Sequence, residues 1–492
     1  MNWRTKSVEQ CLALAEKKGL TRSLGAFQLT MLGIGAIIGT GIFVLTAEAA
    51  QKAGPGMMIS FIIAAVVCAL AALAYAELAA MVPVAGSAYT YTYGVLGEAL
   101  AWIVGWALVL EYAVAAGAVA VGWSGYMNGW LDYFGFGLPE ALRTGPYTGG
   151  TFNLLAFVLV LAITGLLIIG TSKSAKVNAI LVVVKIVALT LFIVMALPAA
   201  QEQNFQPFLP NGWWGSSGMG VIGAAASIFF AYVGFDAVST AAEETRNPNR
   251  NIPIGLIGSL AICTIFYLLV GYAAVGAGGA QPIFGPDGSP LEAGSAALAA
   301  ACSGLNDLVC SNEPLAHVVR ELGMPTLAWW IGTAAAIALP SVVLMMLYGQ
   351  TRIFFTMSRD GLLPEAFSRI HARYQTPHIV TMITGVVVAL FAACFPVGLL
   401  ADISNSGTLF AFMMVAIAVL ILRRTQPNRA RPFRTPAAWV VCPLAAVGCV
   451  FLFYALTPKA KLVFLVWGAI GLAIYFLYGY RNSPFAKGQQ NG

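Results

Sequence analysis

Runs of about 20 apolar residues recur along the whole chain, and this pattern restricts the fold more than any other feature. A helix of that length matches the hydrocarbon thickness of a bilayer. Only 9% of the 492 residues are charged, whereas soluble domains average about 25%. The pattern predicts an all-α integral membrane protein and excludes an ordinary soluble one. Twelve spans are expected, at 27–50, 57–82, 99–127, 152–171, 175–199, 219–241, 253–276, 325–352, 377–397, 402–423, 436–457 and 461–480.

The distribution of Lys and Arg predicts the orientation of these spans. If the N-terminus is cytoplasmic, the cytoplasmic segments hold 20 of the 26 basic residues, the opposite side holds 5, and Lys185 lies within a span. Because basic residues accumulate in cytoplasmic loops, both termini are expected in the cytoplasm. The net charge of +6 then reflects topology, and no nucleic-acid partner is expected. Residues 1–25 lack a signal-peptide profile and are interpreted as a short amphipathic helix on the cytoplasmic surface of the bilayer.

A glycine-rich stretch in the first span, residues 33–41 (GIGAIIGTG), is unusual for a membrane helix. It contains Gly33, Gly35, Gly39 and Gly41. Each glycine costs about 1 kcal/mol relative to Ala in a helix interior, and irregular backbone at membrane depth is tolerated where it is buried in protein or lines a cavity. Two interpretations follow. Either the helix is broken in mid-membrane and its free N–H and C=O groups face a ligand, or the glycines allow close packing against another helix.

The sixth span carries a second irregularity, which favours the broken-helix interpretation. Residues 229–236 (FFAYVGFD) place a glycine and a carboxylate near the middle of that span. Many transporters consist of two inverted repeats with discontinuous helices at matching positions, and the sixth span matches the first if each repeat holds five spans. The expected units are a cytoplasmic segment 1–25, a first repeat 26–199, a second repeat 200–423 with an outer loop 277–324, and two further helices with the C-terminus in 424–492.

Three ionisable residues lie well inside the expected spans, namely Lys185, Glu111 and Asp236. Such residues cost about 2.5–3.5 kcal/mol at a helix centre on insertion scales and are functional candidates by default. Lys185 could exchange a proton or act as a permanent cation in place of a metal ion, or it could be a structural lysine bonded to carbonyls. Glu111 either faces a cavity, where it would bind a cationic ligand group, or pairs within the helix bundle. Asp236 is a candidate for gating, proton binding or substrate contact, with capping of the broken segment as the alternative.

Motifs of soluble enzymes are missing from the sequence. We find no phosphate loop, no nucleotide-binding glycine pattern and no His/Asp/Glu cluster with metal-ligand spacing, so neither an enzyme nor a metal or other cofactor is expected. Cys302 and Cys310 lie close together in a polar loop, and the sequence leaves open both a disulfide and two free thiols. Glu77, near a span end, is expected to form an ion pair at the cytoplasmic face.

Several segments resemble the amino acid–polyamine–organocation (APC) superfamily and, within it, a bacterial member of the cationic amino acid transporter family. The matching segments cover the chain almost end to end; they are 33–44 (GIGAIIGTGIFV), 75–91 (YAELAAMVPVAGSAYTY), 229–253 (FFAYVGFDAVSTAAEETRNPNRNIP) and 352–364 (RIFFTMSRDGLLP). The resemblance implies two inverted five-helix repeats, with broken helices 1 and 6, plus two extra helices. It also implies alternating access in a bacterial inner membrane.

The resemblance implies that a free L-amino acid binds at the two breaks. Its carboxylate would meet backbone N–H groups around Gly39, Thr40 and Gly41, and its ammonium would meet nearby carbonyls. This polarity agrees with the partial charges of half-helix ends. Phe230 would be an aromatic gate over the substrate. The implied substrate-binding residues are Ile37, Gly39, Thr40, Gly41, Phe230, Ala231, Val233 and Gly234, and the carbonyls expected to accept from the ammonium are those of Ile37, Phe230 and Val233.

Lys185 matches a lysine that, in proton-coupled relatives, stands where sodium-coupled ones bind an ion. The resemblance therefore implies proton-coupled import without sodium. It makes Glu111 and Asp236 candidates for contact with a cationic, arginine-like side chain, although bacterial members also accept small neutral amino acids. An amino acid exchanger is the nearest alternative function, and a membrane-embedded enzyme or a transporter-like receptor is more distant. The sequence does not show whether a small accessory membrane subunit binds.

Overall fold

The computed structural model describes residues 24–82, 87–170, 175–215, 218–241, 245–374 and 376–483. In these ranges the ordered elements are helices, and β-structure is limited to isolated bridges such as Leu24 with Thr245. The amphipathic helix expected at 1–25 lies almost entirely outside the described residues. The all-α class is confirmed.

Eight helices of the described ranges are long and apolar enough to cross a membrane, and four shorter apolar helices lie where further spans are expected. The long helices are α5 (Met57–Met81), α7 (Glu98–Tyr133), α9 (Ala175–Ala196), α12 (Pro248–Gly278), α15 (Pro325–Arg359), α17 (Val397–Thr425), α18 (Ala438–Ala455) and α19 (Pro458–Ile474). The shorter apolar helices are α2 (Ala26–Ile37), α8 (Leu154–Ile169), α10 (Gly220–Tyr232) and α16 (His378–Cys394). Other helices are α3 (Thr40–Phe43), α4 (Leu45–Ala53), α6 (Ser87–Val95), α11 (Ala237–Thr240), α13 (Ala296–Ala301), α14 (Pro314–Glu321) and α20 (Tyr480–Asn482).

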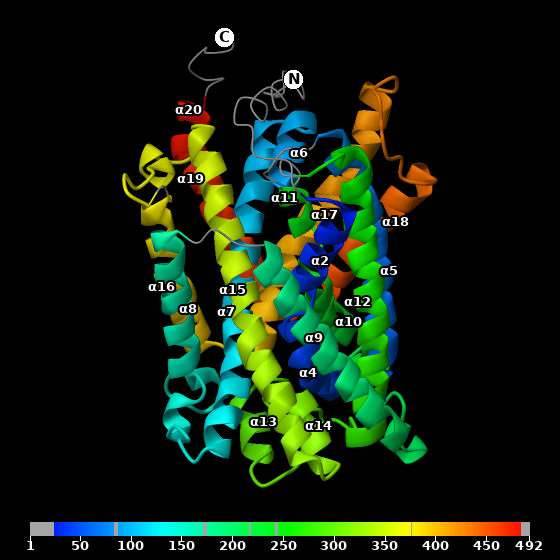
Figure 1. The fold of residues 1–492 in the computed structure, drawn as a ribbon. Helices are drawn as coiled ribbons and strands as arrows, with labels where there is room; N and C mark the ends of the chain where they lie inside the picture. Colours follow the sequence, from blue (N-terminus) through cyan, green and yellow to red (C-terminus); the bar gives the residue numbers. More distant parts are fainter. Residues whose placement is uncertain are drawn as a thin grey trace.

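Burial separates the central helices from the peripheral ones. The most apolar window of α7 is 94% buried inside the protein, whereas the window that includes α19 is only 17% buried. Helix α7 packs against α15 and α17, while α12 packs against α2 and α5. The short segments α2, α4 and α10 lie in the interior of this assembly (Figure 1). A helix that is apolar all round is stable either in a protein core or facing lipid, and both environments occur here.

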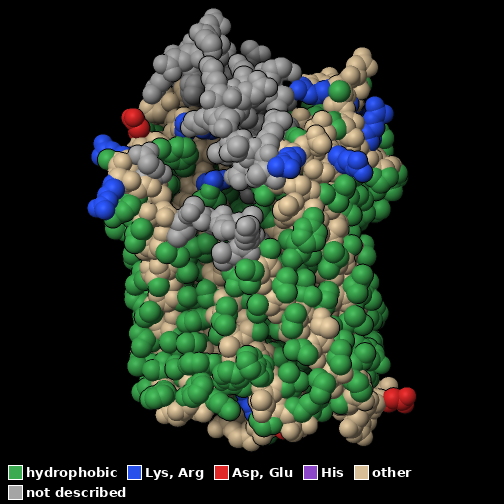
Figure 2. Space-filling model, in the orientation of Figure 1, with side chains coloured by type: hydrophobic (Ala, Val, Ile, Leu, Met, Phe, Trp, Pro, Cys, Tyr) green, Lys and Arg blue, Asp and Glu red, His purple; other side chains and the backbone are tan. Residues whose placement is uncertain are grey.

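The two ends of the molecule differ in charge and structure. Helices α6, α11 and α20 lie at one end, and α13 and α14 lie at the other (Figure 1). On the face shown in Figure 2, Lys and Arg side chains gather at the α6 and α20 end, and hydrophobic side chains cover the body below it. We call these the basic end and the loop end. At the loop end, Cys302 and Cys310 form a disulfide, which resolves the alternative left open by the sequence.

Candidate functional site

The first helix break falls after α2. Helix α2 ends at Ile37, Ile38 and Gly39 have extended backbones, and α3 begins at Thr40. Gly33 and Gly35 are therefore inside a helix rather than in the break. A Cβ at Gly33 would lie 2.4 Å from the Ser259 hydroxyl on α12, so this glycine serves close packing. The glycine-rich stretch thus contains both a break and a packing contact.

The second break follows α10. Val233 has an extended backbone and Gly234 has φ of +115°, a conformation that other residues rarely adopt. A Cβ at Gly234 would also lie 2.9 Å from the carbonyl oxygen of Ala36. Position 234 therefore requires glycine for two independent reasons, its φ angle and the approach to α2.

The two breaks lie against each other in the core. A Cβ at Gly41 would lie only 2.3 Å from the Cα of Ala231, so α3 and α10 approach through bare backbone. The Tyr267 hydroxyl on α12 lies 2.8 Å from both the Ile37 and Ala231 carbonyl oxygens, which share its one proton. Tyr267 was not identified from the sequence. Because the tyrosine lies within an ordinary apolar run, nothing in its surroundings marks it as a link between the breaks.

Amide groups at the first break have no acceptor in the described part of the chain. The N–H groups of Gly39, Thr40 and Gly41 make no hydrogen bond to any described residue. The buried Thr40 hydroxyl is also without a partner among these residues. Since the first N–H groups of a helix lack internal acceptors and carry partial positive charge, this cluster can accept an anion such as a carboxylate.

Carbonyl groups at the breaks differ in their availability. Those of Ile37 and Ala231 accept from Tyr267, and the Phe230 carbonyl accepts from the Val233 amide at 3.2 Å. A ligand ammonium would therefore share the Ile37 carbonyl with Tyr267, since a carbonyl oxygen has two lone pairs. The Phe230 side chain is buried, with 6% of its surface exposed, on the α10 side of the break.

Lys185 on α9 contacts the end of α2 directly. Its ammonium donates to the Gly35 carbonyl at 2.8 Å, and the residue is 1% exposed. Because α2 stops at Ile37, the Gly35 carbonyl does not accept from the Gly39 amide four residues on. Lys185 supplies the missing donor. The lysine is thus placed where a change in its protonation acts on the first break.

Glu111 and Asp236 lie in one buried polar region. Neither carboxyl oxygen of Glu111 accepts a hydrogen bond from the described residues, and the residue is 0% exposed. Asp236 accepts from the Tyr112 hydroxyl at 2.9 Å. Asp236 stands at the N-cap position of α11, where its side chain makes no capping hydrogen bond. Glu111 and Asp236 interact electrostatically, although they are 125 residues apart in sequence.

A buried ion cluster closes the loop end and was missed from the sequence. Lys52 on α4 lies 2.9 Å from Glu48 and 3.3 Å from Asp402 on α17. It also donates to Ser227 on α10, and that hydroxyl donates to Asp402 at 2.5 Å. Lys52 is only 3% exposed and Asp402 only 1%. The expected span began at Asp402, but α17 begins five residues earlier, at Val397. A span drawn from Val397 would have marked Asp402 as an intramembrane charge, which is rare.

The basic end has its own ion cluster. Glu77 on α5 accepts from Arg423 at 2.6 Å and from the Thr435 amide at 2.8 Å, and Arg431 lies 3.3 Å away. This confirms the ion pair expected for Glu77. The α5 and α17 ends are therefore joined to the segment before α18.

Comparisons with known proteins all point to the same family. Residues 24–478 match the model of the amino acid permease family. The chain is 45% identical to the branched-chain amino acid permease BcaP of Bacillus subtilis, with 98% of each chain covered. It is 40% identical to the methylthioribose transporter of the same organism, with 99% of each covered. It is 36% identical to the vacuolar cationic amino acid transporter 4 of Arabidopsis thaliana, covering 83% of this chain and 64% of that protein.

These matches span nearly the whole chain and agree with the resemblance found in the motifs. They indicate a multi-pass membrane transporter rather than an enzyme. The chain belongs to the amino acid permease family of the APC superfamily, and it is similar to cationic amino acid transporters.

Proposed function

We propose that this chain is a proton-coupled symporter that imports a free L-amino acid by alternating access. The observation that carries the proposal is the contact between two helix breaks, beside which the amides of Gly39, Thr40 and Gly41 make no hydrogen bond to a described residue. In this proposal the chain has twelve spans, comprising two inverted five-helix repeats and two extra helices. The basic end faces the cytoplasm of a bacterial cell, with both termini on that side.

The substrate carboxylate would bind the three free amides, and its ammonium would bind carbonyls of the broken helices. This arrangement uses the positive start of α3 for the anion and the negative ends of α2 and α10 for the cation. The Tyr267 hydroxyl has one proton, which Ile37 and Ala231 share. An ammonium at the Ile37 carbonyl would favour donation to Ala231, so substrate binding would shift this contact between the breaks.

The substrate side chain is proposed to be apolar, as in the branched-chain amino acids. Val342 on α15 lies beside Gly39, with side-chain atoms 3.6 and 3.7 Å from the position of a Cβ there. The relative named a branched-chain amino acid permease also matches the chain at 45% identity. An apolar wall next to the amide cluster excludes water from an aliphatic side chain and favours its binding.

A cationic substrate is the second candidate, and Glu111 supports it. A buried carboxylate whose oxygens accept no hydrogen bond from described residues is costly, and a guanidinium could satisfy both oxygens at once. Uptake of radiolabelled leucine and arginine by proteoliposomes distinguishes the two candidates. Loss of arginine but not leucine uptake in Glu111→Gln would assign Glu111 to the side-chain site.

Lys185 is proposed to couple proton movement to transport. The ammonium has three donors and bonds to Gly35 among the described residues. Loss of its proton removes a buried charge and weakens the charge-assisted hydrogen bond to the Gly35 carbonyl, so the first break would respond to protonation.

Uptake by proteoliposomes in sodium-free buffer, with and without an inward proton gradient, tests this coupling. Lys185→Ala should abolish gradient-driven uptake, while Lys459→Ala, at an exposed lysine of the loop end, should not. Equal gradient-driven uptake by Lys185→Ala and the unmodified protein would refute the coupling. Counterflow without net uptake would instead identify an exchanger.

A further inference from the structure

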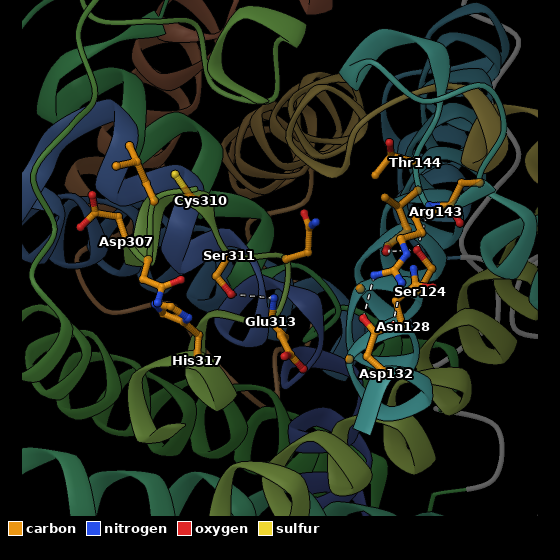
Figure 3. Close-up of a pocket in the computed structure, with 17 residues that line it drawn as sticks. Ser124, Asn128, Asp132, Arg143, Thr144, Asp307, Cys310, Ser311, Glu313 and His317 are labelled. Carbon is orange, nitrogen blue, oxygen red and sulfur yellow. Dashed lines mark hydrogen bonds and ion pairs between the residues drawn. The ribbon is translucent and has the colours of Figure 1, made fainter. Parts of the chain in front are cut away.

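A polar cavity at the loop end is separate from the helix breaks. It has a volume of about 290 Å³ and lies between the outer half of α7, the segment that follows it, and the loop that leads into α14. Figure 3 shows its two walls, with Asp307, Glu313 and His317 on one side and Asp132, Arg143 and Thr144 on the other. Its volume suits a small molecule.

Three carboxylates and one guanidinium line the cavity, and their hydrogen-bonding capacity is partly unused. Arg143 donates twice to Asp132, at 2.7 Å each, and once to the Leu138 carbonyl. A guanidinium has five N–H donors, so two remain for an anion. On the opposite wall, Glu313 pairs with Arg320 through one oxygen at 2.5 Å, and Asp307 adds a second carboxylate.

The imidazole of His317 adds no positive charge to this wall. Burial lowers the pKa of His317, and Arg320 acts in the same direction against Glu321 and Asp307. The imidazole is therefore neutral at pH 7. The wall consequently attracts a cationic group, while the remaining N–H donors of the opposite wall attract an anionic one.

Buried polar groups form the floor of the cavity. The Asn153 amide donates to the Ser124 hydroxyl at 2.8 Å, and Asn153 also caps α8. Asn128 is 8% exposed, and its carbonyl oxygen accepts no hydrogen bond from described residues. Because buried polar atoms are normally satisfied, this oxygen indicates an additional polar partner such as a ligand ammonium or hydroxyl.

The cavity walls are held by close backbone contacts. A Cβ at Gly125 would lie 2.5 Å from the Asn312 carbonyl oxygen, and a Cβ at Gly129 would lie 2.2 Å from a Glu313 carboxyl oxygen. The disulfide of Cys310 fixes the loop next to these residues. The acidic wall is thus pressed onto a glycine face of α7 and is pre-organised.

We propose that this cavity binds a second free amino acid, with its ammonium at Glu313 and Asp307 and its carboxylate at Arg143 and Thr144. The identity of the ligand rests on the proposed transport function. The cavity also lies near the central site. Gly122, one helical turn before the Gly125 wall, packs against the Thr40 side chain at the first break. A bound molecule there would be staged for entry from outside.

Equilibrium binding of radiolabelled leucine and radiolabelled arginine to the full-length protein in nanodiscs tests the proposal. The unmodified protein should bind two molecules of one of these probes per chain, and the Asp307→Asn/Glu313→Gln variant should bind one. Its KM for uptake should rise about tenfold, since a charge-assisted contact is lost. Glu140→Gln, at an exposed position of the α7–α8 segment outside the cavity lining, is the matched control and should bind two. Melting temperature and an intact disulfide verify folding.

A stoichiometry of one in the unmodified protein, two in the double variant, or no binding of either probe would overturn the second site. The transport proposal fails separately. If uptake is absent but the double variant still loses one bound molecule, the cavity is a binding site and the symport mechanism is wrong. If uptake proceeds and the double variant changes neither stoichiometry nor KM, the cavity inference alone fails.

Discussion

Replacing Lys52 with Met tests what closes the loop end. This substitution removes the cation that faces both Glu48 and Asp402. The cluster joins α4, α10 and α17, and α10 contributes Ser227 to it. Because α10 ends at one helix break and α4 follows the other through the short helix α3, opening of this end requires these helices to separate. The variant is therefore expected to favour the open state.

The magnitude follows from the two carboxylates that would remain. Removing one partner of a buried pair costs about 3–5 kcal/mol. The repulsion is relieved if one carboxyl group takes up a proton. For an unperturbed glutamic acid, with a pKa of about 4.3, protonation at pH 7 costs about 3.7 kcal/mol. The loss of stability of the closed state is then limited to about 3.7 kcal/mol. This is roughly 500-fold in the equilibrium between the closed and open states. At pH 5.8 the same reasoning leaves about 2 kcal/mol.

Hydrogen exchange in nanodiscs measures this effect on peptides from α4 and the first half of α17. Lys52→Met should exchange faster than the unmodified protein, and the difference should shrink at lower pH. The triple variant Lys52→Met/Glu48→Gln/Asp402→Asn should restore protection, because neutral side chains do not repel. Asp287→Asn, at an exposed aspartate between α12 and α13, is the control. Unchanged exchange in Lys52→Met, or a triple variant as defective as the single one, would refute the reasoning.

Three further expectations concern packing, the basic end and pH. Gly41→Ala should destabilise the protein by about 1–3 kcal/mol in thermal unfolding, because its Cβ would overlap Ala231; an unchanged melting temperature would contradict this contact. Glu77→Gln should lower the free energy of unfolding by about 2 kcal/mol, which is less than the loss of a fully buried pair because the Arg423 side chain is 20% exposed. Hydrogen exchange at the end of α5 should become faster. Burial lowers the pKa of the His317 imidazole, so the neutral imidazole stabilises the fold, and this stabilisation should be lost as the pH falls below about 6.5. Hydrogen exchange in α14 should become faster at low pH in the unmodified protein, and this pH dependence should be absent in His317→Gln.

The packing of Gly41 changes the interpretation of the glycine-rich stretch. From sequence, Gly41 was expected to let backbone N–H groups approach a carboxylate. Its missing side chain also accommodates Ala231 on α10. A bulky residue at 41 would therefore disturb the contact between helices as well as the amide cluster. Gly39 provides the cleaner test of ligand approach, since a Cβ there would lie 3.6 Å from Val342, an ordinary contact distance.

The sequence alone determined the membrane class and the positions of the apolar helices, because hydrophobic length and charge scarcity act locally along the chain. It also identified both helix breaks and the family, since glycine and carboxylate irregularities are visible without knowledge of contacts. Lys185 stood out for the same reason, as a charge surrounded by apolar residues.

Only the tertiary structure decided which groups meet. Tyr267 reaches the two breaks, and Lys52 meets Asp402 from 350 residues away. These pairings depend on how helices pack against one another. The sequence of a helix shows which of its faces are apolar, but it does not show which other helix packs against them. The loop-end cavity arises in the same way, because α7 and the disulfide-linked loop contribute one wall each.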